Sequence, residues 1–190
     1  MCCSRPCKFC VIVKKYNMKN LHLLTIALLL LVTACKKENI AKQSEYDASY
    51  KAWISFKNSS KNSYSYTTTF GSWVGFGVTI KVAVSNGKVV SRDYIKVQSR
   101  NDGTNNADTV KAWHEDAATI NSHPNDAANA LTIDDIYLKA RTEWLKADAA
   151  TNDIIFEAKN HGLISDCGYV PRNCADDCFR GISITAITAL

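Results

Sequence analysis

The chain has 190 residues, of which 46% are hydrophobic and 22% are charged, and this composition is typical of one globular domain. The formal net charge is +5, but the five basic residues that precede Cys35 account for all of that excess. From Cys35 onward the acidic and basic residues balance, so the domain is formally neutral. Because a neutral domain lacks the basic surface that nucleic acids require, we expect no nucleic-acid partner.

The first element is an export signal over residues 18–34. It has a short basic start, a leucine-rich apolar run and small residues before Cys35, which is the three-part plan of a secretory signal. The apolar run is too short to span a bilayer comfortably. The segment Val32-Thr33-Ala34-Cys35 resembles the lipobox that lipoprotein signal peptidase cleaves. This resemblance implies that Cys35 becomes the first residue of the mature protein and carries its lipid.

These features predict an address and a set of boundaries. We expect a protein of the bacterial cell envelope that is attached to the membrane through lipidated Cys35. Residue 36 is a lysine rather than the aspartate that favours inner-membrane retention in well-studied lipoproteins, so the outer membrane is the expected location. Residues 1–17 are predicted to be an unused upstream extension, 35–43 a tether and 44–190 a single domain. A zinc knuckle on Cys3, Cys7 and Cys10 is the rival interpretation of the extension, but it lacks paired ligand clusters.

The domain is expected to open with a helix. Residues from Ser44 to about Lys57 carry their aromatic side chains on one stripe, and Ser44 with Asp47 makes a start that resembles a capping box. Strand-like alternation then follows in residues 64–70, 78–84 and 88–97.

A hairpin turn is expected at Asn86-Gly87, because a two-residue type I′ turn needs positive φ at both central residues. This turn pairs Val84 with Val89 and Val78 with Ile95. One face of the hairpin is then apolar at both ends.

Two helices are expected in the middle of the domain. Residues 100–130 are rich in Asn, Asp and Ala, but the apolar residues around Trp113 have helical spacing, which predicts a short helix that ends before Pro124. A firmer helix is expected to begin at Thr132, where Thr132 and Asp135 can form a capping box.

Two further strands are expected at residues 153–158 and 181–187, on either side of a cysteine-rich loop. The predicted order of elements is therefore α-β-β-β-α-β-β. Tight turns between consecutive strands favour an antiparallel arrangement. We predict an α+β fold in which an antiparallel sheet of about five strands has two or three helices packed on one face.

Several short motifs follow this order along the domain. They are Trp53, Tyr64-Ser65-Tyr66, and the segments 82–89 at the hairpin, 131–137 at the later helix and 181–184 at the last strand. The arrangement is similar to a family of bacterial secreted proteins and lipoproteins that carry a domain of unknown function. The similarity covers roughly residues 45–187 and implies an envelope setting and an α+β fold, but no activity. The cysteine-rich loop departs from the family, because its simpler members have a shorter turn there.

Cys167, Cys174 and Cys178 lie in an exported domain, so they are candidates for a disulfide in an oxidising compartment. We predict a Cys167–Cys178 disulfide, which closes the loop at its base, with Cys174 as the alternative partner. A Cys174–Cys178 bond is disfavoured if that turn is helical, because Cβ atoms at i and i+4 lie about 6 Å apart and a disulfide needs about 3.8 Å. The rival is zinc held by the three cysteines and His161, but no paired C-x-x-C knuckle is present. No metal and no cofactor are therefore predicted.

The sequence contains no recognisable catalytic motif. His114-Glu115 lacks the second histidine of a metalloprotease helix, and neither a G-x-S-x-G elbow nor a phosphate-binding glycine loop occurs. We therefore predict a non-catalytic binding domain with a protein or cell-surface partner. The alternative is a hydrolase or metal-binding envelope protein that uses His114, or His161 with the cysteine loop. Four aromatic residues form either a ligand-binding face or part of the core: Tyr64, Tyr66, Trp73 and Phe76.

Overall fold

The computed structural model describes residues 39–100 and 106–190. The predicted extension, the signal peptide and Cys35 lie outside the described residues. Within the described ranges, no helix is both long and apolar enough to cross a membrane. The contacts of the domain begin inside the segment assigned to the tether, because Ile40 is buried and the Ala41 amide donates to the Leu145 carbonyl (2.9 Å).

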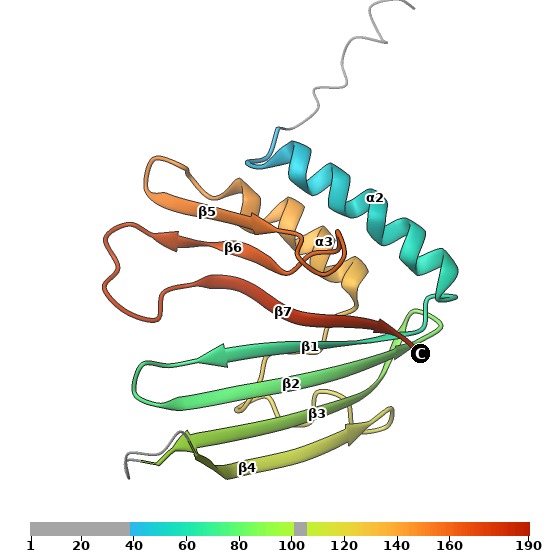
Figure 1. The fold of residues 1–190 in the computed structure, drawn as a ribbon, viewed down its shortest axis with the longest axis vertical. Coiled ribbons are helices and arrows are strands. Elements are labelled where there is room, and N and C mark those ends of the chain that lie inside the picture. Colours follow the sequence, from blue (N-terminus) through green and yellow to red (C-terminus); the bar gives the residue numbers. More distant parts are fainter. Residues whose placement is uncertain (1–38, 101–105) are drawn as a thin grey trace, which may run out of the picture. The chain divides into compact units, whose positions relative to one another are not determined.

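The domain is built on one seven-stranded sheet in which every neighbouring pair is antiparallel. The strands are β1 (Tyr64–Gly71), β2 (Phe76–Ser85), β3 (Lys88–Ser99), β4 (Ala107–Asp116), β5 (Asn152–Glu157), β6 (Asp166–Pro171) and β7 (Arg180–Ala189). Their order across the sheet is β4-β3-β2-β1-β7-β6-β5 (Figure 1). Consecutive strands pair within two groups, β1 to β4 and β5 to β7. Pairing of the first strand with the last joins the two groups.

Two α-helices and one short 3-10 helix accompany the sheet, and the α-helices lie on one side of it, near β5 to β7 (Figure 1). They are α2 (Gln43–Ser59), α3 (Ile133–Thr142) and η1 (Trp144–Lys146). The predicted capping box of α3 is present, because the Thr132 hydroxyl accepts from the Asp135 amide and the Asp135 carboxylate accepts from the Thr132 amide. The predicted cap of α2 is wrong, because its N-cap is Lys42 and Ser44 donates to Glu45 instead.

The core lies between the α-helices and the inner face of the sheet, the face that carries Tyr64. Trp53 of α2 is fully buried, and its indole nitrogen donates to Asp134 at the start of α3 (2.9 Å). Tyr64 packs edge-on against Trp53, and its hydroxyl accepts from the Ile133 amide (2.8 Å). Buried aromatic side chains supply large apolar areas, so these contacts fix α2, α3 and β1 to one another.

The predicted fold class is wrong. The protein is mostly β, with a seven-stranded sheet and two α-helices, rather than a five-stranded sheet with a helical face. The helix expected around Trp113 is strand β4, and the expected cysteine loop contains strand β6. In both places pairing with neighbouring strands overrides the local pattern. The pattern also misled because Glu115 of β4 is polar and yet faces inward.

The turn at Asn86-Gly87 connects β2 to β3 as predicted. Both residues have positive φ (48° and 78°), and Val84 pairs with Val89. The Gly87 amide donates to the Asn62 carbonyl (2.8 Å), so the turn is also tied to the chain that follows α2.

The other predicted pair of this hairpin, Val78 with Ile95, is wrong. A bulge at Val90 shifts the register by one residue. Side chains of β3 beyond the bulge therefore exchange faces. Val82 pairs with Arg92, whose side chain lies inside and is 1% exposed, whereas Ile95 is 44% exposed.

Candidate functional site

A cavity of 240 Å³ lies on the inner face of the sheet, and we call it the near cavity. One wall is the end of the segment 117–132, which connects β4 to α3, and this wall includes Leu131. Lys139 of α3 and Trp144 of η1 also line the cavity. The floor includes four side chains from the strands: Tyr66, Ile80, Val82 and Ile182.

Hydrogen bonds to the main chain hold the wall of the near cavity in place. The Tyr66 hydroxyl donates to the Leu131 carbonyl (2.6 Å), and Arg92 Nη1 donates to the Ala128 carbonyl (2.5 Å). The Ala130 amide donates to the side chain of Asn121 (2.8 Å). The cavity is thus bordered by a connection that the sheet itself positions.

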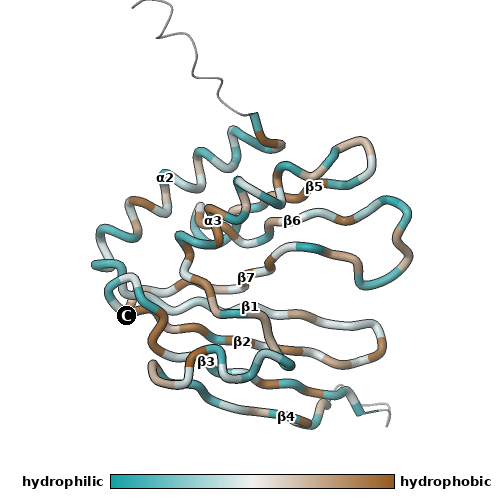
Figure 2. The backbone as a smooth tube through the Cα atoms, turned by 180° about the vertical axis from the view of Figure 1, so that it is seen from behind, coloured by the Kyte–Doolittle hydropathy of each residue, from teal (hydrophilic) through white to brown (hydrophobic). Residues whose placement is uncertain are grey.

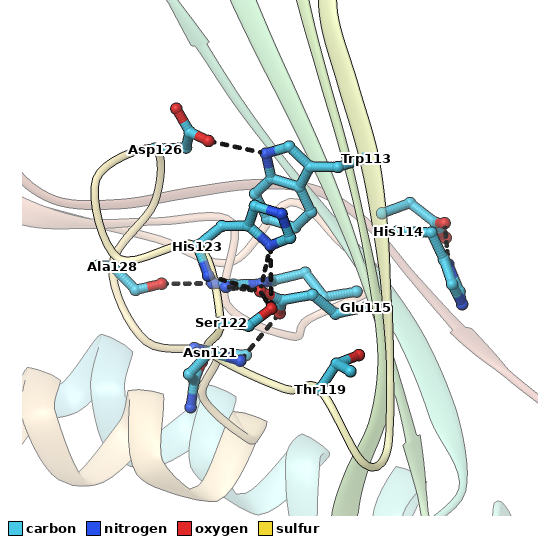
Figure 3. Close-up of polar contacts among 12 residues, drawn as sticks. Trp113, His114, Glu115, Thr119, Asn121, Ser122, His123, Asp126 and Ala128 are labelled. Carbon is cyan, nitrogen blue, oxygen red and sulfur yellow. Dashed lines mark hydrogen bonds and ion pairs between the residues drawn. The ribbon is translucent and has the colours of Figure 1, made fainter.

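Arg92 also forms a buried ion pair with Glu115 beneath this wall (Figure 3). Arg92 Nε and Nη2 donate to the two carboxylate oxygens at 2.9 and 3.0 Å, a bidentate geometry. The Glu115 carboxylate also accepts from the main-chain amides of Asn121 (2.9 Å) and His123 (3.0 Å). The pair therefore binds the connecting segment to β3 and β4.

The surroundings of Glu115 favour its ionised form. Burial raises the pKa of this carboxyl, but hydrogen bonds from Arg92, His123 and Asn121 outweigh burial, so the pKa lies far below its ordinary value. His123 Nδ1 lies 2.9 Å from Glu115 Oε1. A buried charge with this many donors is fully paired, which is the condition for its tolerance in a core.

Three stacked rings cover the ion pair. Tyr94 stacks on Trp113 with ring centroids 4.8 Å apart, and Trp113 stacks on His123 at 4.3 Å. The Trp113 indole nitrogen donates to Asp126 (3.1 Å) in the connecting segment (Figure 3). His123 does not line the near cavity, so its pairing with a carboxylate holds the connection rather than facing a ligand.

The near cavity is electrostatically asymmetric. Among its described lining residues the charged ones are Arg92 and Lys139, and both are cationic. Glu115 neutralises Arg92, whereas the Lys139 side chain is 43% exposed. Lys139 Nζ lies 3.2 Å from Glu143 and 5.4 Å from the Trp144 ring centroid. The cavity therefore combines an apolar floor with a solvent-facing ammonium group.

Sequence reasoning missed both cationic residues of this cavity. The predicted register pairs Val82 with Ser91 and turns Arg92 outward, whereas the bulge turns Arg92 inward. A usable signal was the spacing of two residues between Arg92 and Tyr94, which places a charge and an aromatic ring on one face of a strand. Lys139 carries no signal of its own in a helix that has several charged residues.

The four aromatic residues considered as a ligand face do not form one. Tyr64 and Tyr66 are buried on the inner face, and Tyr66 lines the near cavity. Trp73 is 75% exposed in the connection between β1 and β2, and Phe76 begins β2. The hypothesis was therefore useful for Tyr66 alone.

His114 lies on the opposite face of β4 from Glu115 (Figure 3). Its Nδ1 is 2.7 Å from Asp93 of β3, and the two side chains are 60% and 50% exposed. The pair borders an open depression on the outer face of the sheet. Among the described residues, no serine, threonine or cysteine hydrogen-bonds to His114, so the pair lacks the nucleophile of a catalytic triad.

The structure joins Cys174 to Cys178, whereas the predicted disulfide was Cys167–Cys178. The Cα atoms are 6.2 Å apart, within the usual range, because the turn is not helical and Asp177 has a φ of 47°. Cys167 is a free thiol on β6 and is fully buried. Burial raises its pKa to about 12, which keeps the thiol protonated and unreactive.

The fourth ligand of the zinc hypothesis, His161, is an exposed turn residue with a φ of 54° between β5 and β6. Cys174 and Cys178 are held in the disulfide. Across residues 39–100 and 106–190, no three His, Cys, Asp or Glu side chains are placed to hold a metal ion. The proposed ligands are therefore not assembled into a site.

The sequence matches no protein-family model, and no curated protein or solved structure shows significant similarity to it. The resemblance to envelope proteins of unknown function therefore stays a prediction. The near cavity has to be interpreted from its own geometry.

Proposed function

We propose that this protein is a lipid-anchored envelope lipoprotein whose domain binds a small amphipathic anion without transforming it. Cys35 carries the lipid, and the near cavity holds the ligand. The observation that carries the proposal is a partly enclosed apolar cavity whose two charged lining residues are both cationic. The protein or cell-surface partner expected from the sequence is thereby narrowed to a small molecule.

The shape of the near cavity supports binding of a small ligand. Its 240 Å³ lies just below the range of roughly 300–1,000 Å³ that is typical of small-molecule sites. Ile80, Val82 and Ile182 offer apolar surface on the floor. Burial of a ligand's hydrocarbon part against them is favourable by about 25 cal/mol per Å².

The charge of the near cavity supports an anionic group on the ligand. Lys139 presents its ammonium at the solvent side, and a carboxylate on the ligand can compete with Glu143 for it. The ionised Glu115 stays with Arg92, so its charge does not oppose an anion there.

A binding function rather than catalysis is supported by what lines the cavity. No histidine, cysteine, aspartate or glutamate is among the described lining residues. The two histidine–carboxylate pairs, His114–Asp93 and His123–Glu115, involve residues outside this lining. General acid–base catalysis needs such a group within hydrogen-bond reach of the ligand.

The test uses hexanoate and hexylamine as probes of matched length and opposite charge. Ligand-observed NMR on the full chain in lipid nanodiscs, with empty nanodiscs as the blank, gives both dissociation constants. We expect saturable binding of hexanoate and weaker binding of hexylamine. Absence of saturable hexanoate binding would contradict the proposal.

A pair of lysine variants locates the site. Lys139→Gln should weaken hexanoate binding about two- to fivefold, because an exposed ion pair contributes roughly 0.2–1 kcal/mol. The matched control is Lys88→Gln, at the exposed start of β3 and outside the lining, which should leave binding unchanged. Equal effects of the two variants would place the anion elsewhere.

A further inference from the structure

Strands β1 and β7, which join the two halves of the sheet, separate partway along their length. Their pairing runs from Tyr64 with Ala189 to Thr68 with Ile184, and includes a bulge at Thr185. Past Thr68, β1 pairs with β2 alone, while the first residues of β7 pair with β6. The sheet therefore forks, and the two ribbons diverge there (Figure 1).

A second cavity, of 200 Å³, lies at this fork, and we call it the far cavity. Phe70 of β1, Val78 of β2 and Phe179 before β7 line it, and none of these residues lines the near cavity. Four residues line both cavities, so the two are adjoining parts of one groove: Thr68, Ile80, Gly181 and Ile182.

Phe179 reaches the fork because two glycines give it room. Gly168 and Gly181 face each other on β6 and β7. A Cβ on either glycine would lie 2.6 or 2.8 Å from the Phe179 ring. The absence of side chains at both positions therefore lets the ring pack against the sheet beside the far cavity.

The groove changes in character along β1. Tyr66 is 3% exposed under the helices and the connecting segment, Thr68 is half-buried, and Phe70 is 47% exposed. The apolar row of the inner face thus continues beyond its cover, and the chain is again hydrophobic at the connection between β1 and β2 (Figure 2). All described residues that line the far cavity are uncharged.

We infer that the ligand of this site is a single-chain aliphatic carboxylate, with its head at Lys139 and its chain in the fork. The inference rests on the proposed function and names the class of ligand. A cation stands at one end of the groove, and an uncharged apolar floor runs through Ile80 and Ile182 to Phe70. This gradient matches a molecule with one anionic end and one long apolar end.

An extended peptide fits the groove less well. It would bring a main-chain N–H and C=O at every residue into an apolar space, and each unpaired group costs free energy. The groove floor consists largely of side chains from a sheet face rather than of a free strand edge. An aliphatic chain has no such polar groups to satisfy.

The test maps where each end of the ligand lies. Hexanoate and dodecanoate that carry a diazirine on the terminal carbon are photo-crosslinked to the full chain in lipid nanodiscs, and labelled peptides are identified by mass spectrometry. We expect the six-carbon probe to label near-cavity residues such as Leu131 and Trp144. The twelve-carbon probe should label Phe70, Val78 or Phe179.

Chain length and a matched pair of variants complete the test. Each buried methylene is worth about fourfold in affinity, so dodecanoate should bind at least about tenfold more tightly than hexanoate. Val78→Asp puts a charge in the far cavity and should remove this gain while leaving hexanoate binding intact. Val110→Asp, at an exposed position of β4, should preserve the gain.

The outcomes separate the two proposals. If hexanoate binds but dodecanoate gains nothing, or Val78→Asp has no effect, the chain is not in the fork and the near-cavity proposal survives. Failure of both probes to bind overturns both proposals. Equal labelling of the far cavity by dodecylamine, or its displacement by an unrelated uncharged peptide but not by dodecanoate, overturns the assignment to a carboxylate. Circular dichroism verifies that each variant is folded.

Discussion

At the scale of single residues, Glu115 links the stability of the protein to its candidate site. Its carboxylate is fully buried and is held by Arg92, while Arg92 also donates to the wall of the near cavity. A charge in this position is costly unless it is paired, and pairing fixes both partners. The residue therefore acts on the cavity indirectly, through the position of the connecting segment.

We expect Glu115→Gln to lower the free energy of unfolding by about 3–5 kcal/mol at neutral pH, because it leaves Arg92 buried without a counter-charge. Chemical denaturation monitored by circular dichroism measures this loss. Glu45→Gln, at an exposed position of α2, is the control and should change stability by less than about 0.5 kcal/mol. Equal losses in the two variants would show that the ion pair is not a stabilising contact.

The same carboxylate predicts a dependence of stability on pH. The pKa of Glu115 is lower in the folded protein than its ordinary value of 4.5, so the unfolded state binds more protons as the pH falls below about 5. Its contribution is complete above that pH and is lost progressively in more acidic solution. The wild type should therefore lose stability more steeply than Glu115→Gln between about pH 5 and pH 2.

At the scale of elements, the bulge at Val90 decides which side chains of β3 reach the interior. One extra residue turns Arg92 and Tyr94 inward and leaves Ile95 largely exposed. A side-chain period of two makes this a choice between two faces with no intermediate. The near cavity therefore owes its Arg92 to an irregularity in one strand rather than to any single side chain.

Deletion of Val90 should restore the regular register and turn Arg92 outward. Glu115 would then be buried without its partner, and we expect a loss of about 3–5 kcal/mol in unfolding free energy. The same deletion in the Glu115→Gln background should cost less, and a double-mutant cycle from denaturation curves measures the difference. Additive losses would mean that the bulge and the ion pair are independent.

At the scale of the whole molecule, the short distance in sequence between the lipid and the domain is the main constraint. Five residues separate Cys35 from buried Ile40, so an extended chain reaches at most about 18 Å. If Cys35 is lipidated, the domain stays close to the bilayer. An aliphatic ligand could then enter the groove directly from the membrane that holds the protein.

We expect Cys35→Ser to release the protein from the membrane fraction and to prevent processing at residue 35. Several acyl chains give lasting attachment, whereas a serine cannot receive them in thioether linkage. Fractionation followed by intact-mass measurement tests both effects, and Cys167→Ser serves as a control that leaves acylation unaffected. Retention in the membrane with unchanged processing would refute the predicted address.

The sequence by itself determined the features that depend on a few adjacent residues. The type I′ turn at Asn86-Gly87 and the capping box of Thr132 with Asp135 were predicted and are present. Both rest on backbone conformation and on hydrogen bonds within four residues, which composition and spacing can reveal. The export signal belongs to the same class of inference and stays a prediction.

Tertiary structure alone decided the features that depend on distant partners. β4 and β6 are strands because neighbouring strands pair with them, Arg92 is inside because one bulge shifts a register, and Cys174 meets Cys178 in an irregular turn. The groove arises where β1 and β7, the first and last strands, diverge. No local pattern encodes that meeting, because the free energy of strand pairing belongs to two segments at once.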